Sequence, residues 1–393
     1  MKQTHLAASY MKQFQCTGSA CEDTCCQGWS VDIDKKTFVK YKDLQDKTWK
    51  RKLASHIRRN RYETTYSSYA TIRFPEQGCC PFLNTEKLCS VQLALGERYL
   101  SRTCKLYPRQ HARLYDSYEL TGSLSCPEVA RLALLNPDGI RLEPIESVCE
   151  DDTQLDRLFE ADGLSDAFHE VRQFLVQLLQ TRSLSLVQRL MRLGWFAKAL
   201  TSLLEDGQDE QILMLVSRFR AEATDGNTPP PSRTVSDFPL QLLTYLVEDY
   251  AAHANNSARY KASYQRAMNG INGSHSRYVD AYASVFAPFL REHGYVMENY
   301  LVNYVISRLF PFYGNRTPYE EWIILVLHYA LIQLHLVGIA AEQQSLSPEE
   351  AVSFIQTFAR TFEHDTSYFQ KALSILQEQG LTELDDLEQL LAI

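Results

Sequence analysis

The chain has 393 residues, and 45% of them are hydrophobic, which excludes an intrinsically disordered protein and is enough for roughly two folded domains. Its net charge of −8 is unevenly divided: residues 1–120 hold 20 Lys and Arg against 12 Asp and Glu, and the remainder holds 20 against 36. A cationic first third predicts an anionic ligand or partner there. The acidity of the remainder argues against nucleic acid as a partner.

The segment from Met1 to Cys16 has no hydrophobic run like that of a secretory signal, because lysines and glutamines interrupt it. We therefore expect a cytoplasmic protein. The first 130 residues contain many aromatics and few long periodic runs, with residues 35–61 and 91–103 as candidate helices. This pattern predicts a loop-rich domain over residues 1–135 that a metal centre holds together.

A helical pattern begins near residue 150, which predicts a second, α-helical domain over residues 136–393. Breaker residues between Asp225 and Pro231 predict a loop near 223–236 that divides this domain. The expected helices are 171–179, 184–204, 208–222, 237–253, 256–269, 277–291, 296–310, 319–342, one that begins after an N-cap at Ser347, 367–379 and 382–391. The predicted fold class is therefore mainly α, with a loop-rich, Cys-rich, metal-binding head followed by an all-α body.

The stretch from Trp322 to Ala341 is almost wholly apolar and about 20 residues long, which is enough to cross a bilayer. However, His328, Gln333 and His335 interrupt it, and acidic rather than basic residues flank it. Because a membrane helix normally has cationic anchors and few polar residues, the pattern favours a buried central helix over a membrane span.

All ten cysteines lie within the first 149 residues. Thiols that cluster at short spacings are usually metal ligands or disulfides, and disulfides rarely persist in a reducing cytoplasm. The clustering thus favours a metal or iron–sulfur centre, with unpaired structural thiols as the alternative. The candidate ligands are Cys16, Cys21, Cys25, Cys26, Cys80, Cys89, Cys104 and Cys126.

Spacing alone does not select four ligands from these thiols. Cys80, Cys89 and Cys104 are the best candidates, because each lies near turn or proline residues. Cys25 or Cys26 would be the fourth, since adjacent side chains of an extended segment point to opposite faces. Soft thiolate donors suit both iron–sulfur clusters and structural zinc, and the paired C-x2-C motifs usual for zinc are absent.

Three segments resemble the flagellin lysine-N-methylase family: FQCTGSACEDTCCQGWSVDID, CCPFLNTEKLCSVQLALGERYLSRTCKLYPR and LSCPEVAR. The N-terminal part is similar to a broader zinc- or iron-chelating domain with a CxxCxxCC pattern. The wider spacing from Cys16 to Cys25 departs from that pattern and resembles the methylase branch. The resemblance covers residues 10–135 and extends more loosely over the rest. It implies methyl transfer from S-adenosylmethionine to flagellin lysines, with the cysteines holding a 4Fe–4S cluster.

A lysine methylase needs a neutral amine, and only about 0.04% of a free lysine side chain is neutral at pH 7. Candidate groups near the last cysteines are Tyr107, Tyr115 and Glu119. No G-x-G motif is present to bind the donor in a Rossmann-like fold, so Arg109 and Arg73 are the candidate charge partners of the donor. Two alternative functions remain. One is a non-catalytic adaptor whose head is stabilised by zinc or a cluster, and the other is a redox protein or cluster carrier.

Overall fold

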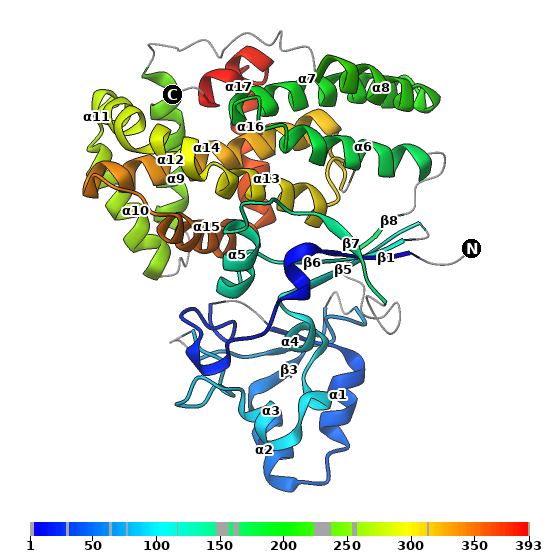
Figure 1. Ribbon diagram of the computed structural model, residues 1–393. Helices are drawn as coiled ribbons and strands as arrows, with labels where there is room; N and C mark the ends of the chain where they lie inside the picture. Colours follow the sequence, from blue (N-terminus) through cyan, green and yellow to red (C-terminus); the bar gives the residue numbers. More distant parts are fainter. Residues whose placement is uncertain are drawn as a thin grey trace.

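The computed structural model describes residues 4–28, 31–62, 65–75, 78–115, 117–146, 157–159, 165–223, 237–253, 258–312 and 314–391. Helices predominate in these ranges, so the predicted mainly-α class is confirmed. Figure 1 shows a small unit with α1–α4 at one end of the molecule, a larger sheet beside α5 in the middle, and the remaining helices at the other end.

The small unit packs short helices against a three-stranded sheet. Its strands lie in the order β2 (Val31–Ile33), β4 (Ala70–Ile72) and β3 (Ile57–Arg59), and its helices are α1 (Lys35–Lys42), α2 (Lys47–His56), α3 (Ser90–Leu95) and α4 (Arg102–Leu106). The Asp34 carboxylate caps α1 by accepting from the Thr37 N–H at 2.8 Å. The helix predicted over 35–61 is therefore two helices, and its last residues pair as β3 instead.

The larger sheet was not predicted from periodicity. Its order is β7 (Leu142–Pro144), β1 (Thr4–Ala8), β6 (Ser117–Gly122), β5 (Arg109–Leu114) and β8 (Arg157–Phe159). The central strand β6 is buried at nearly every position, so it lacks the apolar–polar alternation that marks a half-exposed strand. Strands β7 and β8 lie beyond residue 135 and add sheet to a body that was expected to be all α.

The body follows the predicted helices closely. Its elements are α6 (Ser165–Leu179), α7 (Leu186–Glu205), α8 (Ile212–Ala223), α9 (Phe238–His253), α10 (Ala258–Ile271), α11 (His275–Ala281), α12 (Ala287–His293), α13 (Tyr295–Ser307), α14 (Pro318–Gln343), α15 (Pro348–Phe362), α16 (Thr366–Glu378) and α17 (Leu384–Leu391). A π-helical turn at Tyr282–Phe286 separates α11 from α12 within the helix predicted over 277–291. The predicted loop at Asp225–Pro231 lies outside the described residues.

Helix α14 is the centre of the body, as its sequence predicted. It is long and apolar enough to cross a membrane, yet its most hydrophobic window is entirely buried by the other helices. Helix α10 crosses it where two glycines meet: a Cβ at Gly270 would lie 1.9 Å from the Gly338 carbonyl oxygen. This contact explains two glycines in helix interiors, where they otherwise destabilise.

The core of the body extends into the first 135 residues. Tyr10, Met11 and Phe14 pack in the same apolar cluster as the helices, and so do several residues of α5 (Pro127–Leu134). A separate, smaller cluster contains Val31, Leu53 and Phe82 of the small unit. The division into domains at residue 135 stays a prediction.

Candidate functional site

Backbone hydrogen bonds bring the segment of Cys25 and Cys26 beside the segment of Cys79 and Cys80. The Cys80 N–H donates to the Cys26 carbonyl at 2.7 Å, and the Gly28 N–H donates to the Gly78 carbonyl at 3.0 Å. Gln27 and Cys79 form an isolated antiparallel bridge between these bonds. Segments more than fifty residues apart are thereby held side by side as a short ladder.

A tight loop then returns the chain from Cys80 to Cys89. Leu83 bridges Cys89, and the Asn84 side-chain oxygen accepts from the N–H groups of Glu86 and Leu88 at 3.0 and 2.8 Å. Asparagine favours such turns because its side chain imitates a backbone acceptor. The turn chemistry in this segment was the signal that made Cys80 and Cys89 candidates from the sequence.

Helix α4 brings Cys104 to the same place. The Ser101 hydroxyl caps α4 by accepting from the Cys104 N–H at 3.2 Å. The Asp34 carboxylate, which caps α1, also accepts from the Arg102 N–H at 2.9 Å. One buried carboxylate thus positions the starts of two helices.

Five thiols from these three segments gather, and we call them the five-thiol group: Cys25, Cys26, Cys80, Cys89 and Cys104. The Cys26 thiol hydrogen-bonds with the thiols of Cys25 and Cys80, and Cys89 and Cys104 lie close enough to influence their pKa values. No described cysteine is in a disulfide.

Burial and neighbouring thiols disfavour the charged form of several members of the five-thiol group. A hydrogen bond to Cys26 and burial raise the pKa of Cys25. The hydrogen bond with Cys25 lowers the pKa of Cys26, but a hydrogen bond to Cys80 and burial outweigh it and raise that pKa to about 12. The residue Cys104 is exposed, yet the protein around its thiol raises its pKa to about 11. The hydrogen bond from Cys26 lowers the pKa of Cys80. Cys80 is therefore the most acidic of the three hydrogen-bonded thiols, which are those of Cys25, Cys26 and Cys80.

The vicinal pair Cys25-Cys26 differs from the sequence-based expectation. We expected an extended segment with the two side chains on opposite faces, but both residues lie in a turn and their thiols hydrogen-bond. The opposite-face argument applies only to extended backbone, so it does not choose between these two cysteines.

The remaining candidate thiols form a second neighbourhood. Cys126 precedes α5, and the N–H groups of Glu128 and Val129 hydrogen-bond its sulfur, while burial raises its pKa to about 11. Its neighbours include the thiols of Cys16 and Cys21. Cys21 in turn interacts with Cys25, so the two neighbourhoods adjoin. Cys149 lies outside the described residues.

The thiols do not surround a single-ion position. Among the described ranges, no three His, Cys, Asp or Glu side chains are arranged to hold one metal ion. The donor chemistry, thiols without disulfides, nevertheless fits a soft metal. The choice of four ligands stays a prediction.

Helix α15 of the body clamps the segment between Cys21 and Cys25. The Arg360 guanidinium pairs with the Asp23 carboxylate at 2.8 Å and donates to the carbonyls of Asp23 and Thr24 at 3.1 and 2.9 Å. It also donates to the carbonyl of Gln27. The Gln356 amide, one turn earlier, donates to the Asp23 carboxylate at 2.9 Å. Sequence analysis missed both residues, because a polar stripe on an amphipathic helix normally faces solvent.

Tyr107 lies between the two thiol neighbourhoods. Its hydroxyl is 3.1 Å from the buried Ser125 hydroxyl, which is also 3.0 Å from the His364 Nε2. Burial, followed by the proximity of Cys126, raises the pKa of Tyr107, whereas desolvation lowers the pKa of His364. Tyr107 is therefore a neutral phenol at physiological pH, able to orient a partner but not to act as an anionic base.

The other two candidate catalytic residues lie elsewhere. Tyr115 follows the far end of β5, about 20 Å along the strand from Arg109, and packs edge-on against Phe159 and Phe168. Both carboxylate oxygens of Glu119 accept from the Arg172 guanidinium at 2.8 Å in the protein interior. Glu119 therefore forms a buried ion pair that links β6 to α6.

The two candidate donor-binding arginines are on different elements. Arg109 begins β5, and its guanidinium lies 5.0 Å from the centroid of the Phe14 ring, two residues before Cys16. Arg73 is exposed just after β4, and its N–H donates to the His56 carbonyl at 2.7 Å. Of the two, only Arg109 lies beside the segment that begins the cysteine cluster.

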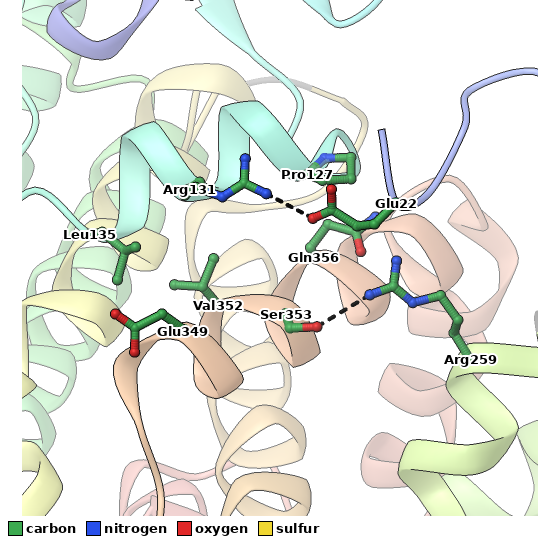
Figure 2. Close-up of a pocket in the computed structure, with 9 residues that line it drawn as sticks. All are labelled: Glu22, Pro127, Arg131, Leu135, Arg259, Glu349, Val352, Ser353 and Gln356. Carbon is green, nitrogen blue, oxygen red and sulfur yellow. Dashed lines mark hydrogen bonds and ion pairs between the residues drawn. The ribbon is translucent and has the colours of Figure 1, made fainter. Parts of the chain in front are cut away.

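A small cavity of about 70 Å³ adjoins the clamped segment (Figure 2). At one edge of it, Glu22 of the cysteine segment pairs with Arg131 of α5 at 2.8 Å. Arg259 of α10 donates to Ser353 of α15 at 3.2 Å and lies 3.4 Å from the Asp23 carboxylate. Elements from both halves of the chain therefore meet around this hollow.

Comparison with known proteins identifies the class. The model of the FliB lysine N-methylase C-terminal domain matches residues 172–391, which is more than half of the chain. The chain therefore belongs to the FliB lysine N-methylase family and is a protein-lysine N-methyltransferase. This result favours the enzyme over the alternative function of a non-catalytic adaptor.

Three relatives are similar to the chain over different lengths. The lysine-N-methylases of Salmonella typhimurium and Salmonella choleraesuis are each 24% identical over 384 residues, covering 91% of this chain and 91% of the relative. The flagellar biosynthetic protein FliU of Salmonella muenchen is 36% identical over 135 residues, covering 34% of this chain and 79% of FliU. No solved structure matches the chain.

Proposed function

We propose that this enzyme transfers methyl groups from S-adenosylmethionine to lysine side chains of flagellin, in the cytoplasm, and that its cysteines hold a 4Fe–4S cluster. A relative that is named a flagellar biosynthetic protein, together with two lysine-N-methylases, supports flagellin as the substrate.

The five-thiol group carries the proposal for a cluster. Its members come from three separate segments, and five nearby thiols exceed the four that a structural zinc ion takes. A cluster spreads its ligands over several iron atoms, so its thiols need not converge on one point. Cys80, Cys89 and Cys104, with Cys25 or Cys26, would hold it. Because four thiolates would occupy all four irons of such a cluster, chelation of the donor's amino and carboxylate groups at one iron would require one of these thiols to leave it.

The connection between the thiols and the family domain supports a catalytic role for this region. Arg360 and Gln356 belong to the part of the chain that matches the lysine N-methylase domain, and both bind the segment at Asp23. With the proposed division at residue 135, the site lies where the head and the body meet.

The reaction requires removal of one proton before methyl transfer. The lysine ammonium loses a proton to solvent or to a base, and its nitrogen lone pair attacks the methyl carbon of the donor. The methyl–sulfur bond breaks, leaving S-adenosylhomocysteine and a methylated ammonium. Tyr107, as a neutral phenol hydrogen-bonded to Ser125, would orient the amine, while Arg109 would pair with the donor's carboxylate.

The test is methyl transfer by the full chain purified without oxygen. Labelled donor should mark flagellin, and flagellin whose lysines are replaced by arginine should stay unlabelled. The variant with Cys80, Cys89 and Cys104 all changed to Ser should lose iron, brown colour and transfer together, while Cys79→Ser retains them. A colourless protein with zinc that still transfers methyl groups would refute the cluster, and no transfer to flagellin would refute the substrate.

A further inference from the structure

The helical body has a second concave site, remote from the cysteines. A cavity of about 230 Å³ lies between the first half of α9, the end of α10 and the start of α11. Its floor is apolar, formed by Leu240 and Ile271, which are 5% and 2% exposed, with Met268 beside them. The floor gives the cavity a dry surface that an aliphatic chain could cover.

The rim of this cavity is acidic. Glu248 and Asp237 both line it, and among the described lining residues the only ionisable group of opposite sign is His275. The His275 Nδ1 lies 3.2 Å from the Asp237 carboxylate, which leaves Glu248 without an ion pair among the described residues. Glu248 is exposed, and Tyr245 beside it is a residue with 52% exposure.

An apolar floor, an uncompensated carboxylate and an aromatic face together suit one chemical class. An alkylammonium group can lay its methylenes on Leu240 and Ile271 while its charge meets Glu248. The face of Tyr245 adds attraction for a cation. An anion would be repelled by this rim, and a purely apolar group would leave Glu248 unused.

We propose that this cavity binds a lysine side chain of the protein substrate, as a docking site separate from the site of methyl transfer. The inference rests on the proposed function for the identity of the ligand, because an enzyme that modifies a lysine-bearing surface meets several lysines at once.

The docked lysine is a different residue from the one that reacts. Helix α10 reaches the cysteine segment at Arg259 and the cavity at Ile271, twelve residues or about 18 Å further along. A lysine side chain cannot span this distance from one backbone position. The cavity therefore holds the substrate by a second lysine and raises the affinity for substrates that carry more than one.

The test measures the affinity of the full chain for two short peptides, both acetylated and amidated at their ends. One peptide contains a single lysine, and its twin has norleucine in place of that lysine. The lysine peptide should bind more tightly than its twin, and Glu248→Gln should weaken that binding at least fivefold. Glu210→Gln removes the same charge from an exposed position on another element, so it should leave binding unchanged. Equal binding of the two peptides, or undiminished binding by Glu248→Gln, would overturn the proposal.

Kinetics separate this inference from the proposed function. Glu248→Gln should raise KM for flagellin several-fold at unchanged kcat, because the variant alters docking and not chemistry. If the wild-type chain does not methylate flagellin but binds the lysine peptide through Glu248, the flagellin proposal fails and the docking site stands. If it methylates flagellin with a KM that Glu248→Gln does not change, the docking site fails alone.

Discussion

The helical body and the small cysteine-bearing unit are stabilised in different ways. In the body, a single helix, α14, is buried by its neighbours on every side, and one continuous apolar cluster extends from α6 to α17. The small unit has a much smaller apolar cluster, and three of the cysteines, Cys80, Cys26 and Cys89, pack in or against it. Its segments are aligned by backbone bridges and by capping side chains such as Asp34. Hydrophobic burial stabilises the first region, whereas polar contacts and thiols organise the second.

Polar contacts join the helical body to the larger sheet and to the cysteine segment near Asp23. Arg172 of α6 pairs with Glu119 of the larger sheet, and Arg360 of α15 binds the segment at Asp23. Both guanidiniums also donate to backbone carbonyls, so each fixes an orientation as well as a distance. Ion pairs at an exposed surface contribute little to the free energy of unfolding, but removing one partner of a buried pair lowers it strongly.

The largest effect should come from removing the proposed metal centre. Chelation of iron should lower the hydrogen-exchange protection of residues 31–106 by roughly 10,000-fold, because a unit with a small core depends on its metal. The protection of α14 should stay unchanged, since burial alone maintains it. Hydrogen exchange followed by mass spectrometry, with and without chelator, measures both regions at once. Equal loss in the two regions would show that they are not stabilised independently.

Loss of the Arg172 side chain should be next in size. Arg172→Met leaves the Glu119 carboxylate buried without its partner, and should reduce the free energy of unfolding by about 3–5 kcal/mol. The exposed pair Lys198–Glu383 provides a control, because Lys198→Met should cost less than about 1 kcal/mol. Urea denaturation measures both. Replacing Arg172 and Glu119 together by Met and Leu should recover much of the loss, and a double variant no more stable than Arg172→Met would contradict this explanation.

Acid should weaken the body through its buried histidines. Burial lowers the pKa of His335 to about 4 and lowers that of His328 as well. Between about pH 6.5 and pH 4 the unfolded chain binds protons that the folded chain does not, so stability falls as the pH falls through this window. His335 alone should account for about 2 kcal/mol between pH 7 and pH 5. Unfolding of His335→Gln at these two pH values tests it: the variant should lose less stability than the wild type, and an identical loss would refute the assignment.

The smallest effect on stability should come from the clamp at Asp23. Arg360→Lys keeps the charge but loses the fork of donors that reaches several oxygens, and should reduce the free energy of unfolding by about 1–2 kcal/mol. Because the segment it holds carries Cys21 and Cys25, iron content and methyl transfer should fall more than stability does. Thermal unfolding, iron analysis and methylation of the same preparation provide the comparison. Loss of stability with full iron content would mean that Arg360 has only a structural role.

Much of the body could be predicted because its signals are local. The 3.6-residue periodicity predicted the ends of α7, α9 and α10 within two residues, and the Ser347 cap and the proline after it marked the start of α15. The position of the cysteines and the turn residues between Cys80 and Cys89 likewise come directly from sequence, as does the buried character of α14. These features depend on neighbours within one or two turns of the chain, where composition and spacing act directly.

Only the tertiary structure decided how distant segments meet. The pairing of β1 with β6 joins residues more than a hundred positions apart, and β6, buried at nearly every position, has no apolar–polar alternation that would predict a strand. The clamp by Arg360 and the burial of Glu119 by Arg172 depend in the same way on partners that no local pattern specifies. A polar residue looks the same in sequence whether it faces water or a buried charge, because only the folded chain determines which oxygen lies opposite its donors.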